Sequence, residues 1–283
     1  MRVRVVPKSG FCFGVEHAIE LAQEMLAAGR QVYCLGHLIH NNRVVQQLVD
    51  AGLHVVEQLD EVPPPQTGSP PPTVLIRSHG CRPEVVQAVR DRGLELADAT
   101  CVLVKRVQKL AAELAAEGYQ VIIVGDPNHP EVQGVLGYAP SAVVVTTEND
   151  LDAVPRQGRL AVLSQTTHSS EDFSRIVGLL AGQPYQEMKV VNTICRETMR
   201  RQASAIEACQ EVDVMFVLGS HHSANTRELA ELCRRQGAQT YHLESWQEFK
   251  PQYIAGSSVA GITAGASTPA WIIREFRENL ERL

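Results

Sequence analysis

The chain has 283 residues, 44% of them hydrophobic and 20% charged, which is the composition of a globular protein long enough for about two domains. The net charge of -6 argues against nucleic acid or an anionic membrane as the main partner, because both recruit clustered Lys and Arg. No apolar run approaches the roughly 20 residues of a membrane-spanning helix, and seven widely spread cysteines are not typical of a secreted disulfide framework, so we expect a cytoplasmic protein.

The first stretch of the chain predicts alternating strands and helices around one cysteine. A strand-like run ends shortly before Cys12, an amphipathic helix follows and ends at Gly29, and a second strand runs into a polar loop that contains His40. The proline-rich segment 63–73 is predicted to be an extended surface loop, and the strand after it delivers His79. The predicted strands lie at residues 2–6, 31–35 and 74–76, and the helix at 15–28.

The same order of elements repeats after Cys101 and again after Cys195. The predicted strands are 94–97, 120–124, 160–163, 188–191, 213–218 and 258–262, and the helices are 102–117 and 198–209. The loops and later strands again deliver polar residues, namely His129, Thr166 and Thr167 in the second stretch and Ser223 and Ser267 in the third.

His40, His129 and Ser223 each lie 28 positions after the preceding cysteine of the repeat, which indicates a threefold internal repeat. The third unit lacks a final strand, and the strand at 2–6 is left over to supply it. We therefore predict an α/β fold of three similar units, residues 1–100, 101–194 and 195–283, with small parallel sheets and right-handed crossovers. Ligands of such sheets bind at the carboxyl ends of the strands.

The three repeated cysteines are each predicted at a helix N-terminus, where the helix dipole and unpaired N–H groups favour the thiolate. Three equivalent thiolates near a common axis suit an iron–sulfur cluster that leaves one iron without a protein ligand, and zinc held by three thiolates is the competing interpretation. Cys34, Cys209 and Cys233 are interpreted as buried structural residues, and Cys81 as a neighbour of the site.

Histidines, hydroxyls and an amide accompany these cysteines and could hold a phosphate or diphosphate through hydrogen bonds. One carboxylate, Glu131, lies beside His129; alone, it would be interpreted as a helix cap or an ion-pair partner. The predicted polar group consists of His40, His79, His129, Thr166, Thr167, Ser223, Asn225 and Ser267.

Nine short motifs resemble those of the 4-hydroxy-3-methylbut-2-enyl diphosphate reductase family, and together they extend over nearly the whole chain. They are Gly10–Val15, Ile39–Asn41, Arg77–Gly80, Asp98–Cys101, His129–Val132, Ser164–Thr167, Asn192–Cys195, Ser223–Asn225 and Thr263–Ser267.

The resemblance implies a trefoil of three α/β units around a 4Fe-4S cluster held by Cys12, Cys101 and Cys195. It implies that the allylic hydroxyl of the substrate binds the open iron and leaves as water after transfer of two electrons and protons, which yields isopentenyl and dimethylallyl diphosphates. Glu131 is expected to deliver the proton, with Thr167 and His129 orienting the relay. The expected substrate-binding residues are His40, His79, His129, Thr166, Ser223, Asn225 and Ser267.

Two other functions compete with this interpretation: a cluster-bearing redox sensor or electron carrier, and a zinc hydrolase that uses the same cysteines and histidines. The polar group argues against the first, because electron transfer needs no diphosphate clamp. No Gly-x-Gly-x-x-Gly fingerprint is present, so electrons are expected from ferredoxin or flavodoxin rather than from bound NAD(P)H.

Overall fold

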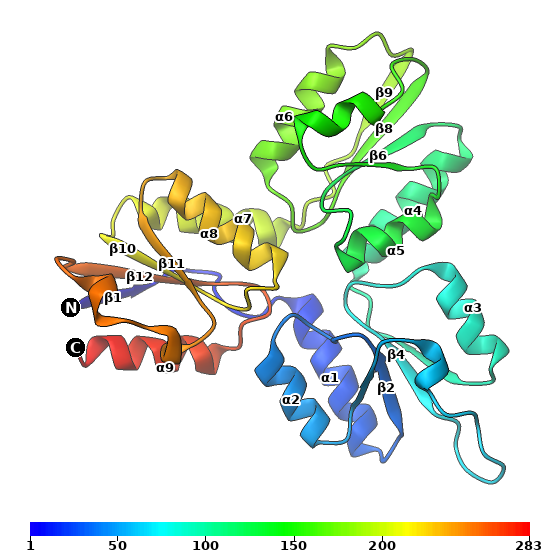
Figure 1. Cartoon of the computed structure of the whole chain (residues 1–283), viewed down its shortest axis with the longest axis horizontal. Helices are drawn as coiled ribbons and strands as arrows, with labels where there is room; N and C mark the ends of the chain where they lie inside the picture. The colour runs from blue at the N-terminus through cyan, green and yellow to red at the C-terminus, as the bar shows by residue number, and fades with distance from the viewer. The chain divides into compact units, whose positions relative to one another are not determined.

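Helices and parallel strands alternate along the chain in the computed structural model, which describes residues 1–283 (Figure 1). The strands are β1 (Arg2–Val5), β2 (Val32–Leu35), β3 (His54–Val56), β4 (Thr73–Ile76), β5 (Glu95–Asp98), β6 (Gln120–Val124), β7 (Val143–Val145), β8 (Arg159–Ser164), β9 (Glu187–Val190), β10 (Val214–Leu218), β11 (Gln239–Leu243) and β12 (Val259–Ala264). The helices are α1 (Phe13–Ala27), α2 (Asn42–Asp50), α3 (Pro83–Asp91), α4 (Val102–Ala116), α5 (Pro130–Tyr138), α6 (Ser170–Ala181), α7 (Arg196–Cys209), α8 (Ala224–Arg235) and α9 (Ala270–Glu281). The predicted α/β class is confirmed.

The strands form three parallel sheets of four, and each sheet has the same strand order. The orders are β3-β2-β4-β5, β7-β6-β8-β9 and β11-β10-β12-β1. In the last sheet β1 lies in the fourth place, with Val5 opposite Ile262 on β12. The N-terminal strand therefore completes the sheet that the third repeat leaves one strand short, and the prediction of three similar sheets is confirmed.

The chain forms two compact units. The first comprises Met1–Glu16, Ile39–Gln46 and Arg196–Leu283, and it contains the sheet completed by β1. The second comprises His17–Leu38 and Gln47–Cys195, and it contains the other two sheets. The division into three units at residues 100 and 194, expected from the repeat, stays a prediction.

The central strands of each sheet are mostly apolar, which is typical of parallel sheets covered on both faces. All residues of β4 and of β10 are buried. Helix α4 is an example of how the helices pack against the sheets. Its buried apolar residues recur at three- and four-residue steps, at Val104, Val107, Ala111 and Leu114. Truncating such a residue, Leu114 for example, to alanine costs about 2–5 kcal/mol.

Glycines and prolines mark the helix ends and the loop that the sequence predicts. Gly29 and Gly118 follow α1 and α4 with φ of +72° and +83°, a region that favours glycine. The segment before β4 contains no helix or strand from Pro63 to Pro72 and is largely exposed, as expected for a surface loop. No helix of the chain has both the length and the apolar character required to span a bilayer.

Candidate active site

The three repeated cysteines share one local setting. Each follows the fourth strand of a sheet, directly precedes a helix, and is partly exposed. The backbone N–H of each donates to a carbonyl oxygen in the loop that follows the third strand of the same sheet. The bonds run from Cys12 to Ala266 (3.1 Å), from Cys101 to Ser78 (3.0 Å) and from Cys195 to Thr166 (2.9 Å).

Two of the helices that follow these cysteines begin earlier than their apolar periodicity indicates, whereas α4 begins at Val102 as predicted. Helix α1 begins at Phe13 and α7 at Arg196, directly after Cys12 and Cys195. Cys101 is the N-cap of α4. All three thiols therefore lie at helix N-termini, where thiolate is favoured, as the sequence predicts.

The other four cysteines differ from these three. Cys34, Cys209 and Cys233 are buried, which confirms their interpretation as structural residues, and no disulfide joins any of the seven. Burial raises the pKa of the Cys34 thiol to about 12 and that of Cys81 to about 11, so both stay protonated at neutral pH. The three repeated cysteines are partly exposed and offer soft sulfur donors, and this donor chemistry fits an iron–sulfur cluster.

Glu131 is the buried acid of the second unit. It lies in the first turn of α5, is 2% exposed, and accepts two hydrogen bonds from Thr166, one from the backbone N–H and one from the hydroxyl, both at 2.7 Å. Burial raises the pKa of Glu131 to about 7, and the two bonds from Thr166 oppose that shift because they favour the ionised form. A carboxyl with this pKa can both donate and accept a proton near neutral pH.

His129 and Thr167 differ in their contacts with Glu131. His129 caps α5, and its Nδ1 accepts a hydrogen bond of 3.2 Å from the backbone N–H of Glu131. The His129 ring also meets the His79 ring edge-on, with 5.5 Å between the centroids. Thr167 makes no hydrogen bond to Glu131; its hydroxyl accepts one of 2.9 Å from the side-chain amide of Gln165. The structure thus places Thr166, rather than Thr167, against the acid.

Gln165 is a supporting residue that the sequence did not single out. It is 3% exposed, and its amide oxygen accepts from the backbone N–H of Asp126 at 3.0 Å while its amide nitrogen donates to Thr167. A Cβ at Gly125 would lie 2.8 Å from that amide oxygen, so the turn after β6 needs glycine. In the sequence, only the family-like motif Ser164–Thr167 pointed to Gln165.

The first unit gathers polar groups suited to an anion. Ser223 caps α8 and accepts from the N–H of Thr226 at 3.3 Å, and Asn225 lies in the first turn of that helix. The Asn225 side-chain nitrogen is buried without a hydrogen-bond partner, and a buried unsatisfied donor is costly unless a ligand accepts from it. Ser267 donates to the carbonyl oxygen of His40 at 2.9 Å. An orphaned donor beside a helix N-terminus fits a phosphate group.

The chain is similar to proteins of one kind over its whole length. The LytB protein family model matches residues 3–281. A 4-hydroxy-3-methylbut-2-enyl diphosphate reductase of Geobacter sp. (strain M21) is 40% identical over 100% of this chain and 98% of its own. The enzyme of that name from Aquifex aeolicus is also 40% identical, over 99% of this chain and 96% of its own.

Two solved structures resemble the fold. One is of (E)-4-hydroxy-3-methyl-but-2-enyl diphosphate reductase, described as the terminal enzyme of the non-mevalonate pathway; it is 39% identical, covers 100% of both chains and has a TM-score of 0.70. The other is of the E-1-hydroxy-2-methyl-but-2-enyl-4-diphosphate reductase from Plasmodium falciparum, which is 27% identical over 100% of this chain and 87% of that chain, with a TM-score of 0.90.

Proposed function

The chain belongs to the LytB protein family of iron–sulfur-dependent reductases, and we propose that it removes the hydroxyl of 4-hydroxy-3-methylbut-2-enyl diphosphate to give isopentenyl and dimethylallyl diphosphates. In this reaction a carbon–oxygen bond of the substrate breaks, two electrons and two protons enter, and water leaves. The chain is an oxidoreductase of isoprenoid biosynthesis that acts on a small diphosphate.

One relationship carries the proposal. Thr166 holds the carboxyl of Glu131 with its N–H and hydroxyl, while its carbonyl oxygen accepts from the N–H of Cys195. A single residue therefore joins the buried acid to a cysteine of the repeated set. This arrangement suits a reductase in which proton delivery and electron delivery occur close together, and it has no purpose in an electron carrier without a substrate.

We assign Cys12, Cys101 and Cys195 as the ligands of a 4Fe-4S cluster, which when bound supplies electrons one at a time and a Lewis-acidic iron. Glu131 gives its proton to the departing hydroxyl oxygen, and Thr166 and His129 hold it in position. The predicted role of Thr167 in this relay stays a prediction, with Gln165 orienting its hydroxyl.

The diphosphate is assigned to the polar residues that the sequence predicts for it. Asn225 offers the buried donor described above, and Ser223 and Ser267 lie before α8 and α9, whose N-termini favour negative charge. His40, His79, His129 and Thr166 complete the proposed set. We propose that the electrons come from ferredoxin or flavodoxin in the cytoplasm. We also propose that the repeat divides the chain into three structural units, with boundaries at residues 100 and 194.

The test is turnover of 4-hydroxy-3-methylbut-2-enyl diphosphate by anaerobically purified protein with a reduced viologen as electron source. We expect brown protein that contains iron and sulfide and releases both products. Colourless protein with stoichiometric zinc would favour the hydrolase, and iron–sulfur protein without turnover would favour the redox sensor or electron carrier.

A further inference from the structure

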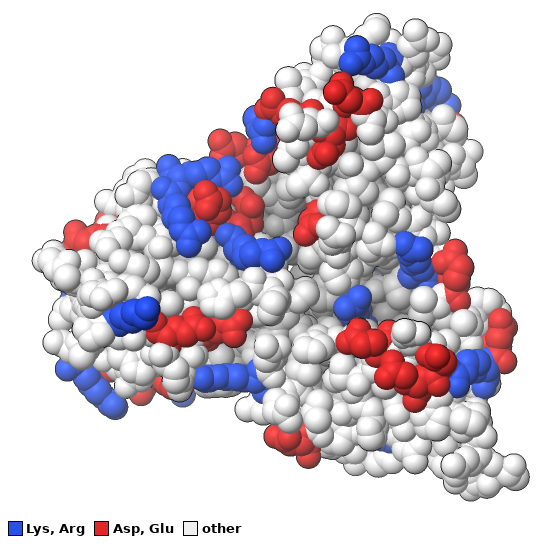
Figure 2. Space-filling view, in the orientation of Figure 1, with Lys and Arg blue, Asp and Glu red and all other residues white.

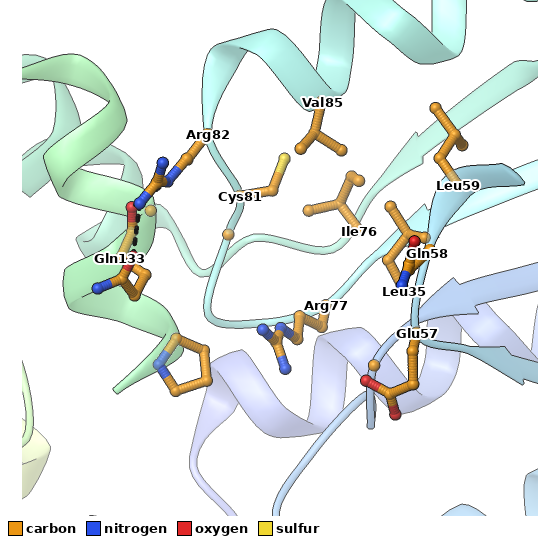
Figure 3. A pocket seen from close by; sticks show the side chains of 14 residues that line it. Leu35, Glu57, Gln58, Leu59, Ile76, Arg77, Cys81, Arg82, Val85 and Gln133 are labelled. Carbon is orange, nitrogen blue, oxygen red and sulfur yellow. Dashed lines mark hydrogen bonds between the residues drawn. The ribbon is translucent and has the colours of Figure 1, made fainter. Parts of the chain in front are cut away.

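A cavity of about 340 Å³ lies at the carboxyl ends of strands of the β3-β2-β4-β5 sheet, within the second unit (Figure 3). Its lining includes Leu35 and Gly36 at the end of β2, Arg77 directly after β4, and residues from the first turns of α3 and α5. None of the residues assigned above to the cluster, the proton relay or the diphosphate lines it. The volume falls at the lower end of small-ligand sites.

Arg77 is the central polar group of this cavity. Its guanidinium extends among the lining side chains in Figure 3, where no hydrogen bond to it is drawn, and the Glu57 carboxylate attracts it electrostatically. Gly36, with φ of +70°, leaves room for it, since a Cβ there would lie 2.7 Å from Nη1. Burial lowers the pKa of Arg77 and the Glu57 carboxylate opposes this shift; the guanidinium stays charged, and a half-buried charge that lacks hydrogen-bond acceptors is unfavourable.

The charge balance of the lining favours an anion. The lining contains two arginines, Arg77 and Arg82, and one carboxylate, Glu57, so its net charge is positive. Arg82 is held in place at the start of α3, where it donates to the side-chain oxygen of Gln133 at 2.5 Å (Figure 3). The first turns of α3 and α5 add the positive ends of two helix dipoles to the same cavity.

The opposite side of the cavity is apolar. Leu35, Leu59, Ile76 and Val85 line it, and Figure 3 draws Ile76, Val85 and Leu59 on the side away from the Arg77 guanidinium. The neutral thiol of Cys81 lies among them. A site with a cation on one side and short aliphatic side chains on the other suits a ligand with an anionic head and a short hydrocarbon tail.

We propose that this cavity is a second site for a short-chain alkyl diphosphate, in which Arg77 pairs with the diphosphate and the aliphatic wall covers the hydrocarbon. The choice of a branched five-carbon chain rests on the proposed function, because the products of that reaction have this chemistry. Product bound here would let the enzyme respond to accumulation of its product through a site other than the catalytic centre.

The experiment is calorimetric titration of the anaerobic holoenzyme with isopentenyl diphosphate. We expect two molecules per chain in the wild type. Arg77→Gln removes the cation and Val85→Trp fills the cavity from a different segment, so each should reduce the count to one or weaken one site at least tenfold. Arg90→Gln, an exposed arginine on the same helix as Val85, is the matched control and should keep both sites.

A second variant separates this inference from the proposed function. Asn225→Asp places a negative charge in the proposed catalytic diphosphate site and should remove the other binding event, so that the Arg77→Gln and Asn225→Asp double variant binds none. A wild type that binds one molecule, or two sites that both survive Arg77→Gln and Val85→Trp, overturns the second site. Unchanged binding in Asn225→Asp contradicts the proposed catalytic clamp and leaves the result for Arg77 intact.

Titration with inorganic diphosphate tests the apolar wall. The head group alone should bind at the Arg77 site more weakly than isopentenyl diphosphate, and Val85→Trp should affect it less. Equal affinity of the two ligands at that site would contradict a role for the hydrocarbon tail.

Discussion

The guanidinium of Arg201 donates to the carbonyl oxygen of Gly10 across 2.8 Å, two residues before Cys12. A second bond of 2.6 Å runs to the carbonyl oxygen of Ala264, and Arg201 is only 3% exposed. The N–H of Cys12 also donates to the carbonyl oxygen of Ala266. The loop that contains Cys12 is therefore held against the end of β12 by this bond and by the bridge through Arg201. Gly10 has φ of +105°, which residues with side chains rarely adopt, so the loop takes a conformation that needs support.

Arg201→Met should therefore lower the iron content of the protein. The substitution leaves two buried carbonyl oxygens without this donor, at a cost of about 1–3 kcal/mol each, and loosens the loop before Cys12. Arg201→Lys keeps the charge but cannot reach both carbonyls as a planar fork, so it should recover only part of the loss. The measurements are iron per chain after anaerobic purification and the midpoint of thermal unfolding.

The control for this prediction is Arg200→Met on the same helix. Arg200 is exposed and pairs with Glu197 at 2.9 Å, an interaction worth little at a surface. We expect it to retain wild-type iron content. Equal iron content in Arg201→Met and in the wild type would contradict the role assigned to Arg201.

Cysteine-to-serine substitutions should distinguish the cysteines that bind the cluster from a cysteine that does not. Cys12→Ser, Cys101→Ser and Cys195→Ser are each expected to lose most of the bound iron, because serine replaces a soft thiolate at a helix start. Cys81→Ser should keep it, since Cys81 lies outside the repeated strand–cysteine–helix setting and lines a cavity that contains none of the other three. Iron and sulfide analysis of the four variants is the measurement, and equal loss in all four would indicate a four-cysteine site.

The repeat made most of the fold predictable from the sequence. Strands such as β6 and β10 are continuous apolar runs next to glycine, and the predicted range 120–124 coincides with β6. The edge strands β1, β5 and β9 were predicted, whereas β3, β7 and β11 were not. Strands β3 and β7 have three residues each, too few for a periodic pattern to be recognised.

Side-chain partners were less predictable than elements. Arg201 was not singled out, since an arginine on an amphipathic helix is usually exposed, and only the structure reveals that it is buried against two carbonyl oxygens. Thr166 and Thr167 are adjacent hydroxyls in the sequence. Only the backbone conformation after β8 determines which of them contacts Glu131.

Glu131→Gln should keep the cluster and bind substrate but lose turnover by about 10²–10⁴-fold, the usual contribution of a general acid. The amide has nearly the same shape and can still accept from Thr166, but it has no acidic proton to give. The readouts are iron content, substrate affinity and turnover with reduced viologen. Near-normal turnover would remove Glu131 from the reaction.

A matched pair of threonine variants tests the residue that positions the acid. Thr166→Val removes the hydroxyl that donates to Glu131, whereas Thr167→Val removes one that is bonded to Gln165. We expect Thr166→Val to move the alkaline limb of the pH profile of turnover to higher pH, because the ionised carboxylate loses a donor and Glu131 keeps its proton to a higher pH. A shift in Thr167→Val alone would restore the original assignment of the relay to Thr167.

The raised pKa of Glu131 also predicts how stability depends on pH. The group titrates near 4.5 when unfolded and about 7 when folded, so the folded state binds the proton more tightly. The resulting stabilisation is fully present below pH 4.5, declines as the pH rises, and is lost above about pH 7. The pKa difference of about 2.5 between the two states corresponds to roughly 3 kcal/mol of stability. Glu131→Gln cannot titrate, so the wild type should lose stability relative to this variant between pH 5 and pH 8, approximately the span of the shift. Denaturant unfolding of both cluster-loaded proteins at the two pH values measures the difference, and a relative gain by the wild type at the higher pH would mean that Glu131 is held as a carboxylate.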